Sequence, residues 1–476
     1  MKLKKIKQRQ RIDNLEIIEA AAEGNSLGKK DDMVVFVPFC VPGDIVNVEV
    51  ERQKKNYCQA SLIEVLHYSD KREKEKCPHF GICGGCKWQI MQYSWQLFYK
   101  NKQVLDNLQR IGRIDTSNAS YIIGADREYF YRNKLEYTFS TKSYLTKQEI
   151  QSKENNLQKP ALGFHVPKFF DKVIDIEYCA LQEEPSNEIR NFIRDYTLKN
   201  NLTYYDIKGH FGLMRNIIIR LTTTKEIMLI VCFAQKSKEI LPLLNAIKDK
   251  FPQITSLMYC INEKLNDTIF DQKIICFSGK DHIVEKMPYY NDSKKSLKFK
   301  IGAKSFYQTN SLQAYKLYSK AVEFAQLKRE YLVYDLYCGI GTITNFIAPY
   351  VREVIGIEQV EDAILDARNN SEFNGIRNTK FFAGDTEKIL DEDFIKENGK
   401  PDIVITDPPR AGMHQKVIET LLEIEAKKII YISCNPASQA RDSLLLMEKY
   451  SVGRIQSVDM FPQTQHVENI IEFILK

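Results

Sequence analysis

The first 70 residues contain short runs in which apolar residues cluster or alternate with polar ones at the length of β-strands. Val34–Phe39, Ile45–Val50 and Ala60–Val65 are three such runs, and Val41–Asp44 (Val-Pro-Gly-Asp) has the composition of a turn. Several short strands in so short a stretch predict a small β-barrel of the oligonucleotide-binding kind over residues 1–70. Its loop Lys-Lys-Asn-Tyr places cations beside an aromatic ring, which suits RNA, although an ordinary basic turn on a structural barrel is the alternative.

Residues 71–310 mix helical and strand patterns without a repeat, which predicts an α+β central domain. A charged linker opens it, and Ser94–Ile111 has apolar residues at helical spacing. Tyr129–Tyr137 interleaves aromatic and basic residues, a composition suited to stacking on bases and pairing with phosphates. Thr141–Pro160 lacks periodicity and is expected to be an exposed loop.

Residues 311–476 repeat a strand, a loop and a helix, which predicts a doubly wound parallel sheet of the Rossmann-like kind. The expected fold class is therefore α/β plus all-β, with the α+β domain in between. The apolar runs that predict the strands are 331–337, 353–357, 379–382, 403–406, 428–433, 453–460 and 469–475.

Composition narrows the class of protein. A chain of 476 residues exceeds one core, so several domains are expected. No apolar stretch reaches the roughly 18 residues that span a bilayer, and the basic N-terminus lacks the apolar segment of a secretory signal, so we expect a cytoplasmic protein. We also expect a monomer. The net charge is +10 over residues 87–310 and −6 over 311–476. The positive charge of the first two thirds of the chain suggests that this part binds a polyanion. A solvated lysine-rich surface is the alternative.

The first strand of the α/β domain runs into Cys338-Gly-Ile-Gly-Thr342, a loop that lets backbone approach a ligand closely. Glu358 ends the second strand, where a carboxylate can accept both hydroxyls of a ribose, and Asp385 follows the third, near the usual place of an adenine ring. A dinucleotide-binding domain would show the same features. Asp407-Pro-Pro-Arg410 after the fourth strand favours a class I methyltransferase and S-adenosylmethionine instead.

Cys434 ends the fifth strand, at the edge where open α/β sheets bind ligands. Carbon 5 of a pyrimidine needs a thiolate added at carbon 6 before it can accept a methyl group, and a base must then remove the carbon 5 proton. The alternative interpretation of Cys434 is a buried, unreactive cysteine with a structural role. An N-methyltransferase acting through the Asp407 loop, for which Cys434 would be dispensable, is a further alternative.

Glu468 lies just before the last strand and is the expected base, with a pKa raised by burial. His466 is the rival base, and an ordinary surface glutamate is the alternative reading of Glu468.

Together these motifs resemble the RNA (uracil-5-)-methyltransferases of the RlmD/TrmA type over nearly the whole chain. The matching segments are Gly302–Asn310 (GAKSFYQTN), Asp335–Gly341 (DLYCGIG), Asp407–Gly412 (DPPRAG), Ser433–Pro436 (SCNP) and His466–Glu468 (HVE). The first 70 residues resemble the TRAM domain, a small RNA-binding barrel. Cytosine-5 enzymes also use cysteine, but typically after a proline, a place that Ser433 occupies here.

The resemblance implies roles for individual residues. Cys434 would be the nucleophile and Glu468 the general base. S-adenosylmethionine would be bound by Gln308, Tyr337, Glu358 and Asp407, with Asp385 as a further contact. The TRAM-like barrel and a group of closely spaced cysteines, Cys77, Cys83 and Cys86, favour 23S ribosomal RNA, in the large subunit, as substrate, with transfer RNA as the alternative. A non-catalytic RNA-binding factor of ribosome assembly is a rival from another class.

The 11 cysteines are an odd number in a chain without an export signal, so metal or catalytic roles are more plausible than disulfides. Cys77, Cys83 and Cys86 form one tight triplet, which fits iron–sulfur better than the paired spacings usual for zinc. The resemblance points to Cys179 as the fourth ligand of a [4Fe–4S] cluster. Zinc, with His79 as a possible ligand, is the less favoured alternative. The remaining cysteines, Cys40, Cys58, Cys232, Cys260 and Cys276, are expected to be incidental.

Overall fold

The computed structural model describes residues 10–146, 149–150 and 159–476. The chain divides into two compact units, residues 1–103 with 461–466, and residues 104–460 with 467–476. Among the described residues no helix is long and apolar enough to cross a membrane. The predicted three-domain division is a finer partition that stays a prediction.

The first unit is built on a closed five-stranded barrel with strand order β1-β2-β3-β5-β4. Apolar residues that alternate along each strand fill the barrel interior, among them Val35, Val37 and Val48, which are fully buried. The predicted barrel is confirmed. Its strands are β1 (Arg11–Ala20), β2 (Asn25–Lys30), β3 (Met33–Pro38), β4 (Ile45–Gln53) and β5 (Tyr57–His67).

A segment from the far end of the chain returns to this first unit. Gln463 accepts the backbone N–H groups of Lys87 and Trp88 on its carbonyl oxygen, at 2.9 and 3.1 Å. Gln96, near the start of α1 (Tyr93–Arg110), donates from Nε2 to Gln463 Oε1 at 3.0 Å and accepts the backbone N–H of Gln463 on its own Oε1 at 2.9 Å. The predicted helix at 94–111 therefore forms, and residues 461–466 pack against its first half.

The second unit contains a seven-stranded sheet with the order β13-β12-β11-β10-β7-β8-β9. The residues of β11 are buried along its whole length and those of β10 nearly so, as expected for central strands covered on both faces. The sheet strands are β7 (Lys134–Ser140), β8 (Ala161–Val166), β9 (Phe169–Asp175), β10 (Met214–Leu221), β11 (Ile227–Phe233), β12 (Ser256–Ile261) and β13 (Ile274–Gly279). Its helices are α3 (Ser186–Lys199) and α4 (Ile240–Lys250).

An eight-stranded sheet, β18-β17-β16-β19-β20-β22-β21-β6, forms the rest of the second unit. Strands β16 to β20 run parallel, as predicted, and the strand order reverses between β16 and β19. They are β16 (Leu332–Leu336), β17 (Glu353–Glu358), β18 (Thr379–Ala383), β19 (Ile403–Thr406) and β20 (Lys428–Ser433), and the tail strands are β21 (Tyr450–Val458) and β22 (Glu468–Leu475).

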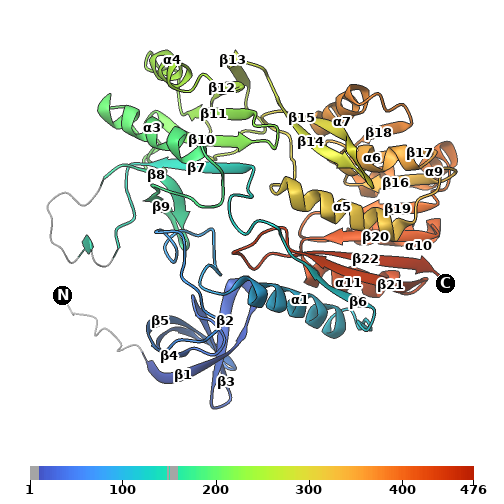
Figure 1. Cartoon of the computed structure of the whole chain (residues 1–476), viewed down its shortest axis with the longest axis horizontal. Helices are drawn as coiled ribbons and strands as arrows, with labels where there is room; N and C mark the ends of the chain where they lie inside the picture. The colour runs from blue at the N-terminus through green and yellow to red at the C-terminus, as the bar shows by residue number, and fades with distance from the viewer. Residues whose placement is uncertain (1–9, 147–148, 151–158) are drawn as a thin grey trace. The chain divides into compact units, whose positions relative to one another are not determined.

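Helices flank this sheet as the reversal of strand order requires, because right-handed crossovers on either side of the switch lie on opposite faces. Between the two sheets of this unit lie the hairpin of β14 and β15, and the helix α5 (Figure 1). Their bounds are β14 (Ile283–Tyr289), β15 (Asp292–Ile301), α5 (Ser311–Ala325), α6 (Thr342–Ile347), α7 (Glu361–Phe373), α8 (Thr386–Ile389), α9 (Glu392–Asn398), α10 (Gln415–Ile424) and α11 (Pro436–Leu446).

Two features of this sheet differ from the expectation of an all-parallel arrangement. Strand β22 runs antiparallel to both β20 and β21, so the sheet is mixed. The edge strand β6 (Ala119–Ile123) pairs with β21 from more than 300 residues away in sequence. A strand of five residues with two exposed side chains carries too weak a pattern to predict its partner. The predicted loop 141–160 lies partly outside the described residues.

Candidate active site

The predicted site residues gather at the carboxyl edge of the eight-stranded sheet. Tyr337 follows β16, Glu358 ends β17, and Asp385 follows β18, while Asp407 follows β19 and Cys434 follows β20. Because β22 runs antiparallel to β20, its first residue, Glu468, begins at the same edge. The strand order switches at β16 and β19, where open α/β sheets form their binding crevice.

The loop after β16 has the backbone geometry of a close ligand contact. Tyr337 has a φ of 65°, Gly339 of 54° and Gly341 of 75°, in the left-handed region. A Cβ built on Gly339 meets no atom within 4 Å, so the space above this glycine is open rather than filled by the protein. The glycine at position 339 is thus suited to a ligand lying against the backbone, as a cofactor would.

Glu358 and Asp385 are held in fixed positions beside this loop. The Glu358 carboxylate accepts the N–H of Gly339 at 3.1 Å and that of Val360 at 3.0 Å, one on each oxygen. Asp385 caps α8 by accepting the N–H of Glu387 at 3.3 Å. Burial, and then the nearby Asp385 carboxylate, raises the pKa of Tyr337 to about 12. The open glycine and the two carboxylates fit an adenosine-containing cofactor.

Cys434, Asp407 and Glu468 form a cluster of acidic groups at the same edge of the sheet. Glu468 is 4% exposed, and burial and the Asp407 carboxylate raise its pKa well above the usual range. Burial also raises the pKa of Asp407 to about 7. The Cys434 thiol has a pKa raised to about 11, by burial first and then by the charges of Glu468 and Asp407. The Arg410 guanidinium opposes these shifts at Cys434 and Glu468.

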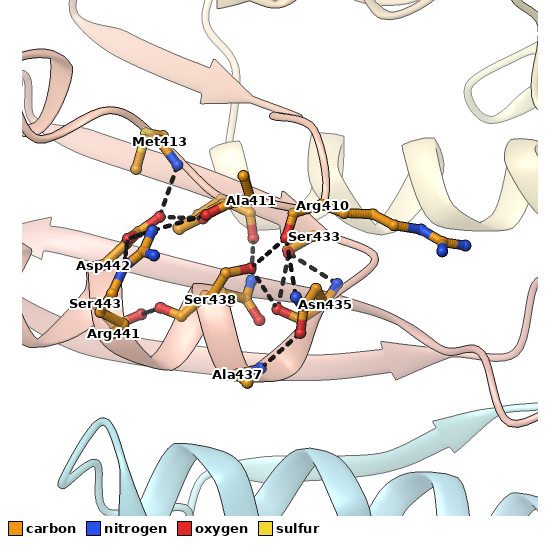
Figure 2. A network of polar contacts seen from close by, with 12 residues as sticks. Arg410, Ala411, Met413, Ser433, Asn435, Ala437, Ser438, Arg441, Asp442 and Ser443 are labelled. Carbon is orange, nitrogen blue, oxygen red and sulfur yellow. Dashed lines mark hydrogen bonds and ion pairs between the residues drawn. The ribbon is translucent and has the colours of Figure 1, made fainter. Parts of the chain in front are cut away.

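The loop that carries Asp407 and Arg410 is fastened to the turn that carries Cys434 (Figure 2). The carbonyl oxygen of Arg410 accepts hydrogen bonds from Asn435 Nδ2 at 2.9 Å and Ser438 Oγ at 3.1 Å. Asn435 also caps α11 by accepting the N–H of Ala437 at 3.1 Å. Asn435, the residue after Cys434, therefore fixes both the start of α11 and the Asp-Pro-Pro-Arg loop.

Asp442 on α11 fastens the far end of the same loop (Figure 2). Its Oδ2 accepts the N–H of Met413 at 2.8 Å and the hydroxyl of Tyr431 at 2.7 Å, while Arg441 donates to its Oδ1 and to the carbonyl of Ala411. A Cβ on Gly412 would lie 2.4 Å from Oδ2, so this loop requires glycine there. Sequence reasoning assigned no role to Arg410 or Asp442; a buried aspartate within a helix gives no signal of its partner.

Gln308 lies on the loop between β15 and α5, which Asn310 ends by capping α5 through the N–H of Gln313 at 3.2 Å. His466, the rival base, belongs to the other compact unit, where its ring lies edge-on to Phe461 with centroids 6.2 Å apart. Within the second unit, the buried carboxyl of Glu468 is, after burial itself, the largest influence on the pKa of Cys434, ahead of Asp407 and Arg410.

The predicted cluster cysteines fall in different units. Cys77, Cys83 and Cys86 lie on a looped segment of the first unit, where Gly85 donates its N–H to Cys83 Sγ at 3.4 Å. Cys179 is buried in the second unit, with Asn187 accepting its N–H at 2.8 Å. Among the described residues no three His, Cys, Asp or Glu side chains converge as a metal site. The thiolate set suits a cluster by its chemistry, but its convergence stays a prediction.

Comparisons with known proteins extend over nearly the full length of the chain. It is 50% identical over 455 residues to an uncharacterized RNA methyltransferase of Bacteroides thetaiotaomicron, covering 95% of this chain and 99% of that one. It is 49% identical to one of Porphyromonas gingivalis, covering 96% and 98%. A family described as tRNA (uracil-5-)-methyltransferase matches residues 244–474.

A solved structure matches the whole architecture. It is the tRNA (uracil-54, C5)-methyltransferase of Pyrococcus abyssi in complex with S-adenosyl-L-homocysteine, at a TM-score of 0.73 and 26% identity over 98% of this chain and all of that one. The chain belongs to the RNA (uracil-5-)-methyltransferase family. The predicted enzyme class and the use of S-adenosylmethionine are confirmed.

The same comparison weakens one argument from sequence. A transfer-RNA enzyme of this family aligns with 98% of the chain, a span that includes the barrel. The barrel is therefore compatible with either RNA and does not by itself favour ribosomal RNA.

The buried carboxyl of Asp407 makes the site sensitive to pH. Its pKa of about 7 exceeds the ordinary value of about 3.9 in an unfolded chain, so the folded protein holds a proton that the unfolded chain has released between these values. The free energy of unfolding should fall as the pH rises across this window. Asp407→Asn removes the titration and should gain roughly 2–4 kcal/mol relative to wild type between pH 4 and pH 8.

Chemical denaturation of both proteins at a series of pH values measures this difference. Asp13→Asn, on the exposed surface of the barrel, is the matched control and should follow the wild-type curve. Parallel curves for Asp407→Asn and wild type would contradict a raised pKa at Asp407.

Proposed function

We propose that the chain methylates carbon 5 of a uridine in 23S ribosomal RNA through a covalent adduct of Cys434 with carbon 6 of the uracil ring. The observation that carries this proposal is a thiol at the carboxyl edge of β20, in the electrostatic field of Glu468 and Asp407. Methylation of a nitrogen or an oxygen needs no thiol, since those acceptors have their own lone pair.

Cys434 acts first. Its thiol, with a pKa of about 11, is protonated at neutral pH, so its proton passes to water, which reaches the half-buried Cys434, as the sulfur attacks carbon 6. The Arg410 guanidinium stabilises the thiolate by lowering its pKa. Addition at carbon 6 moves the ring electrons toward carbon 5 and the carbonyl at carbon 4. S-adenosylmethionine, when bound, supplies the methyl group that carbon 5 accepts.

Glu468 acts last. Carbon 5 then carries both the methyl group and its original proton, and the adduct persists until that proton is removed. The Glu468 carboxylate takes the proton, the electron pair of the broken bond forms the carbon 5–carbon 6 double bond, and the thiolate leaves carbon 6. A high pKa makes Glu468 a stronger base than an exposed carboxylate, which is what proton removal from carbon requires.

The cofactor is held, in this proposal, by five groups around the open loop after β16. Glu358 would bind the ribose hydroxyls, and Tyr337 and Asp385 would contact the adenosine. Gln308 and Asp407 would hold the remainder of the cofactor. The fixed Glu358 carboxylate and the open space over Gly339 support this arrangement. The target uridine must leave its stack to reach Cys434, since its carbon 5 and carbon 6 are covered within one.

Cys434→Ala should abolish methyl transfer while leaving the affinity for S-adenosylmethionine unchanged, because the thiol supplies the adduct and no cofactor contact. Transfer of a radiolabelled methyl group to RNA measures the first effect and calorimetry the second. Cys276→Ala, at an exposed cysteine of the other sheet, is the control and should retain full activity. Turnover by Cys434→Ala would instead indicate an N-methyltransferase.

Glu468→Gln should slow turnover by at least about a hundredfold, the range typical for loss of a general base. Because adduct formation precedes proton removal, the variant should accumulate enzyme covalently joined to RNA, visible as a slow band on a denaturing gel. His466→Ala is the matched control. Adduct accumulation in His466→Ala, with normal turnover in Glu468→Gln, would transfer the role of base to the histidine.

The charge and the cysteines of the first two thirds of the chain support ribosomal RNA as the substrate. A net charge of +10 over residues 87–310 suits a folded RNA segment. The Pyrococcus abyssi relative, which acts on transfer RNA, makes transfer RNA the second candidate. Mass spectrometry of 5-methyluridine in separated ribosomal and transfer RNA from a deletion strain decides between them, and loss confined to transfer RNA would overturn the ribosomal assignment. Loss from neither would favour a non-catalytic assembly factor.

We further propose that Cys77, Cys83, Cys86 and Cys179 bind a [4Fe–4S] cluster in a cytoplasmic, monomeric enzyme. The four thiols supply a donor set of the right number and kind, and no catalytic step passes through the cluster. Protein purified without oxygen should contain iron and sulfide and absorb visible light broadly. Colourless protein with one equivalent of zinc would refute the assignment.

A further inference from the structure

The loop Gly302–Asn310, here called the motif loop, is held from two directions. On the side of the eight-stranded sheet, Ser305 Oγ donates to Asp366 Oδ2 on α7 at 2.6 Å, and Asn310 Nδ2 donates to the carbonyl oxygen of Met460 at 3.1 Å. These bonds fix where the loop begins its turn and where it ends. They leave the middle of the loop, which carries Gln308, to other contacts.

The seven-stranded sheet supplies those other contacts. Arg220 on β10 donates from Nη1 to the carbonyl oxygen of Ser305 at 2.8 Å and from Nη2 to that of Ala303 at 3.2 Å. Asn133, just before β7, donates from Nδ2 to the carbonyl oxygen of Gln308 at 2.9 Å. Its backbone N–H donates to the carbonyl oxygen of Thr309 at 2.8 Å. Four carbonyl groups of one loop therefore face two residues of the neighbouring sheet.

We propose that Arg220 and Asn133 are positioning residues of the seven-stranded sheet, which shape the motif loop so that Gln308 meets the cofactor. This inference rests on the proposed role of Gln308 in binding S-adenosylmethionine. Neither residue needs to touch the cofactor. Their effect passes through the backbone of the loop, whose carbonyl oxygens they hold.

Burying an arginine costs free energy because its guanidinium loses water. The hydrogen bonds that Arg220 makes to the motif loop offset this cost, which indicates that they matter for the shape of the loop. Arg220 is 6% exposed, and burial lowers its pKa to about 10, so it stays charged at neutral pH. Charge-assisted bonds from one rigid planar fork to two carbonyls set both the distance and the curvature of the backbone between them. Lysine keeps the charge but has no fork, so it would hold one carbonyl at a time.

The chain offers a matched control on the same strand. Arg215 on β10 is 1% exposed and uses the same kind of fork. It donates from Nη1 to the carbonyl oxygen of Asn262 at 2.8 Å and from Nη2 to that of Asn266 at 2.9 Å and to Asp267 Oδ1 at 2.8 Å. It thus holds the loop after β12, whose residues have no part in the proposed site.

Arg220→Lys and Arg215→Lys should both lower the melting temperature, since each variant loses a buried guanidinium group with at least two hydrogen bonds. Only Arg220→Lys should raise the dissociation constant for S-adenosylmethionine, by about tenfold, and Asn133→Ala should do the same; Arg215→Lys should stay within about twofold. Calorimetry of the full chain, at a temperature where every variant is folded, measures this. Equal effects of the two arginine variants on cofactor affinity, or none from either, would overturn the inference.

Gln308→Ala separates this inference from the function on which it rests. If Arg220 acts through Gln308, the double variant Arg220→Lys/Gln308→Ala should bind the cofactor no more weakly than Gln308→Ala alone, a non-additive result expected of coupled residues. Full additivity would mean that Arg220 acts elsewhere. Unchanged affinity in Gln308→Ala would refute the cofactor role of Gln308 itself, whatever the arginine variants show.

Discussion

The proposed chemistry depends on holding acidic groups together in a place where each resists ionisation. Asp407, Glu468 and Cys434 share a poorly solvated edge of the sheet, where Asp407 raises the pKa of Glu468 and both carboxyl groups raise the pKa of Cys434. Two carboxylates and a thiolate would repel one another strongly there, since water screens them little. The arrangement therefore favours a state in which protons are shared among the groups. In the proposed mechanism a raised pKa makes Glu468, once ionised, a strong acceptor for the proton that carbon 5 releases.

Such a cluster remains in place only if the backbone around it is fixed. The bonds from Asn435 and Ser438 to the carbonyl of Arg410 keep the cation-bearing loop against the turn that carries the thiol. Asp442 closes the other end of that loop through Met413 and Tyr431. Repulsion between the acidic groups is thus resisted by hydrogen bonds that other side chains make to the backbone of these loops. Because the loops are fixed, Asp407, Glu468 and Cys434 keep their raised pKa values and do not move apart.

The sequence predicts the parts of this site that depend on local pattern. Apolar runs ending in Asp407 and Cys434 place both groups at one edge, because parallel strands in sequence order share a carboxyl edge. The barrel follows from alternation within its strands. Contacts between distant segments are not readable in this way. The pairing of β6 with β21, and the return of residues 461–466 to the first unit, depend on surfaces that exist only after folding.

Arg220 shows why a residue can be visible in the sequence while its role is not. It follows Asn216 and three isoleucines in a strand whose neighbours are buried on both faces, so a charged side chain at that place must find partners. The pattern gives the requirement but does not say which acceptors meet it. These are carbonyl oxygens, which every residue possesses and no sequence marks. Buried charges inside apolar strands are therefore informative places to look for links between domains, because desolvation makes them costly to keep without such partners.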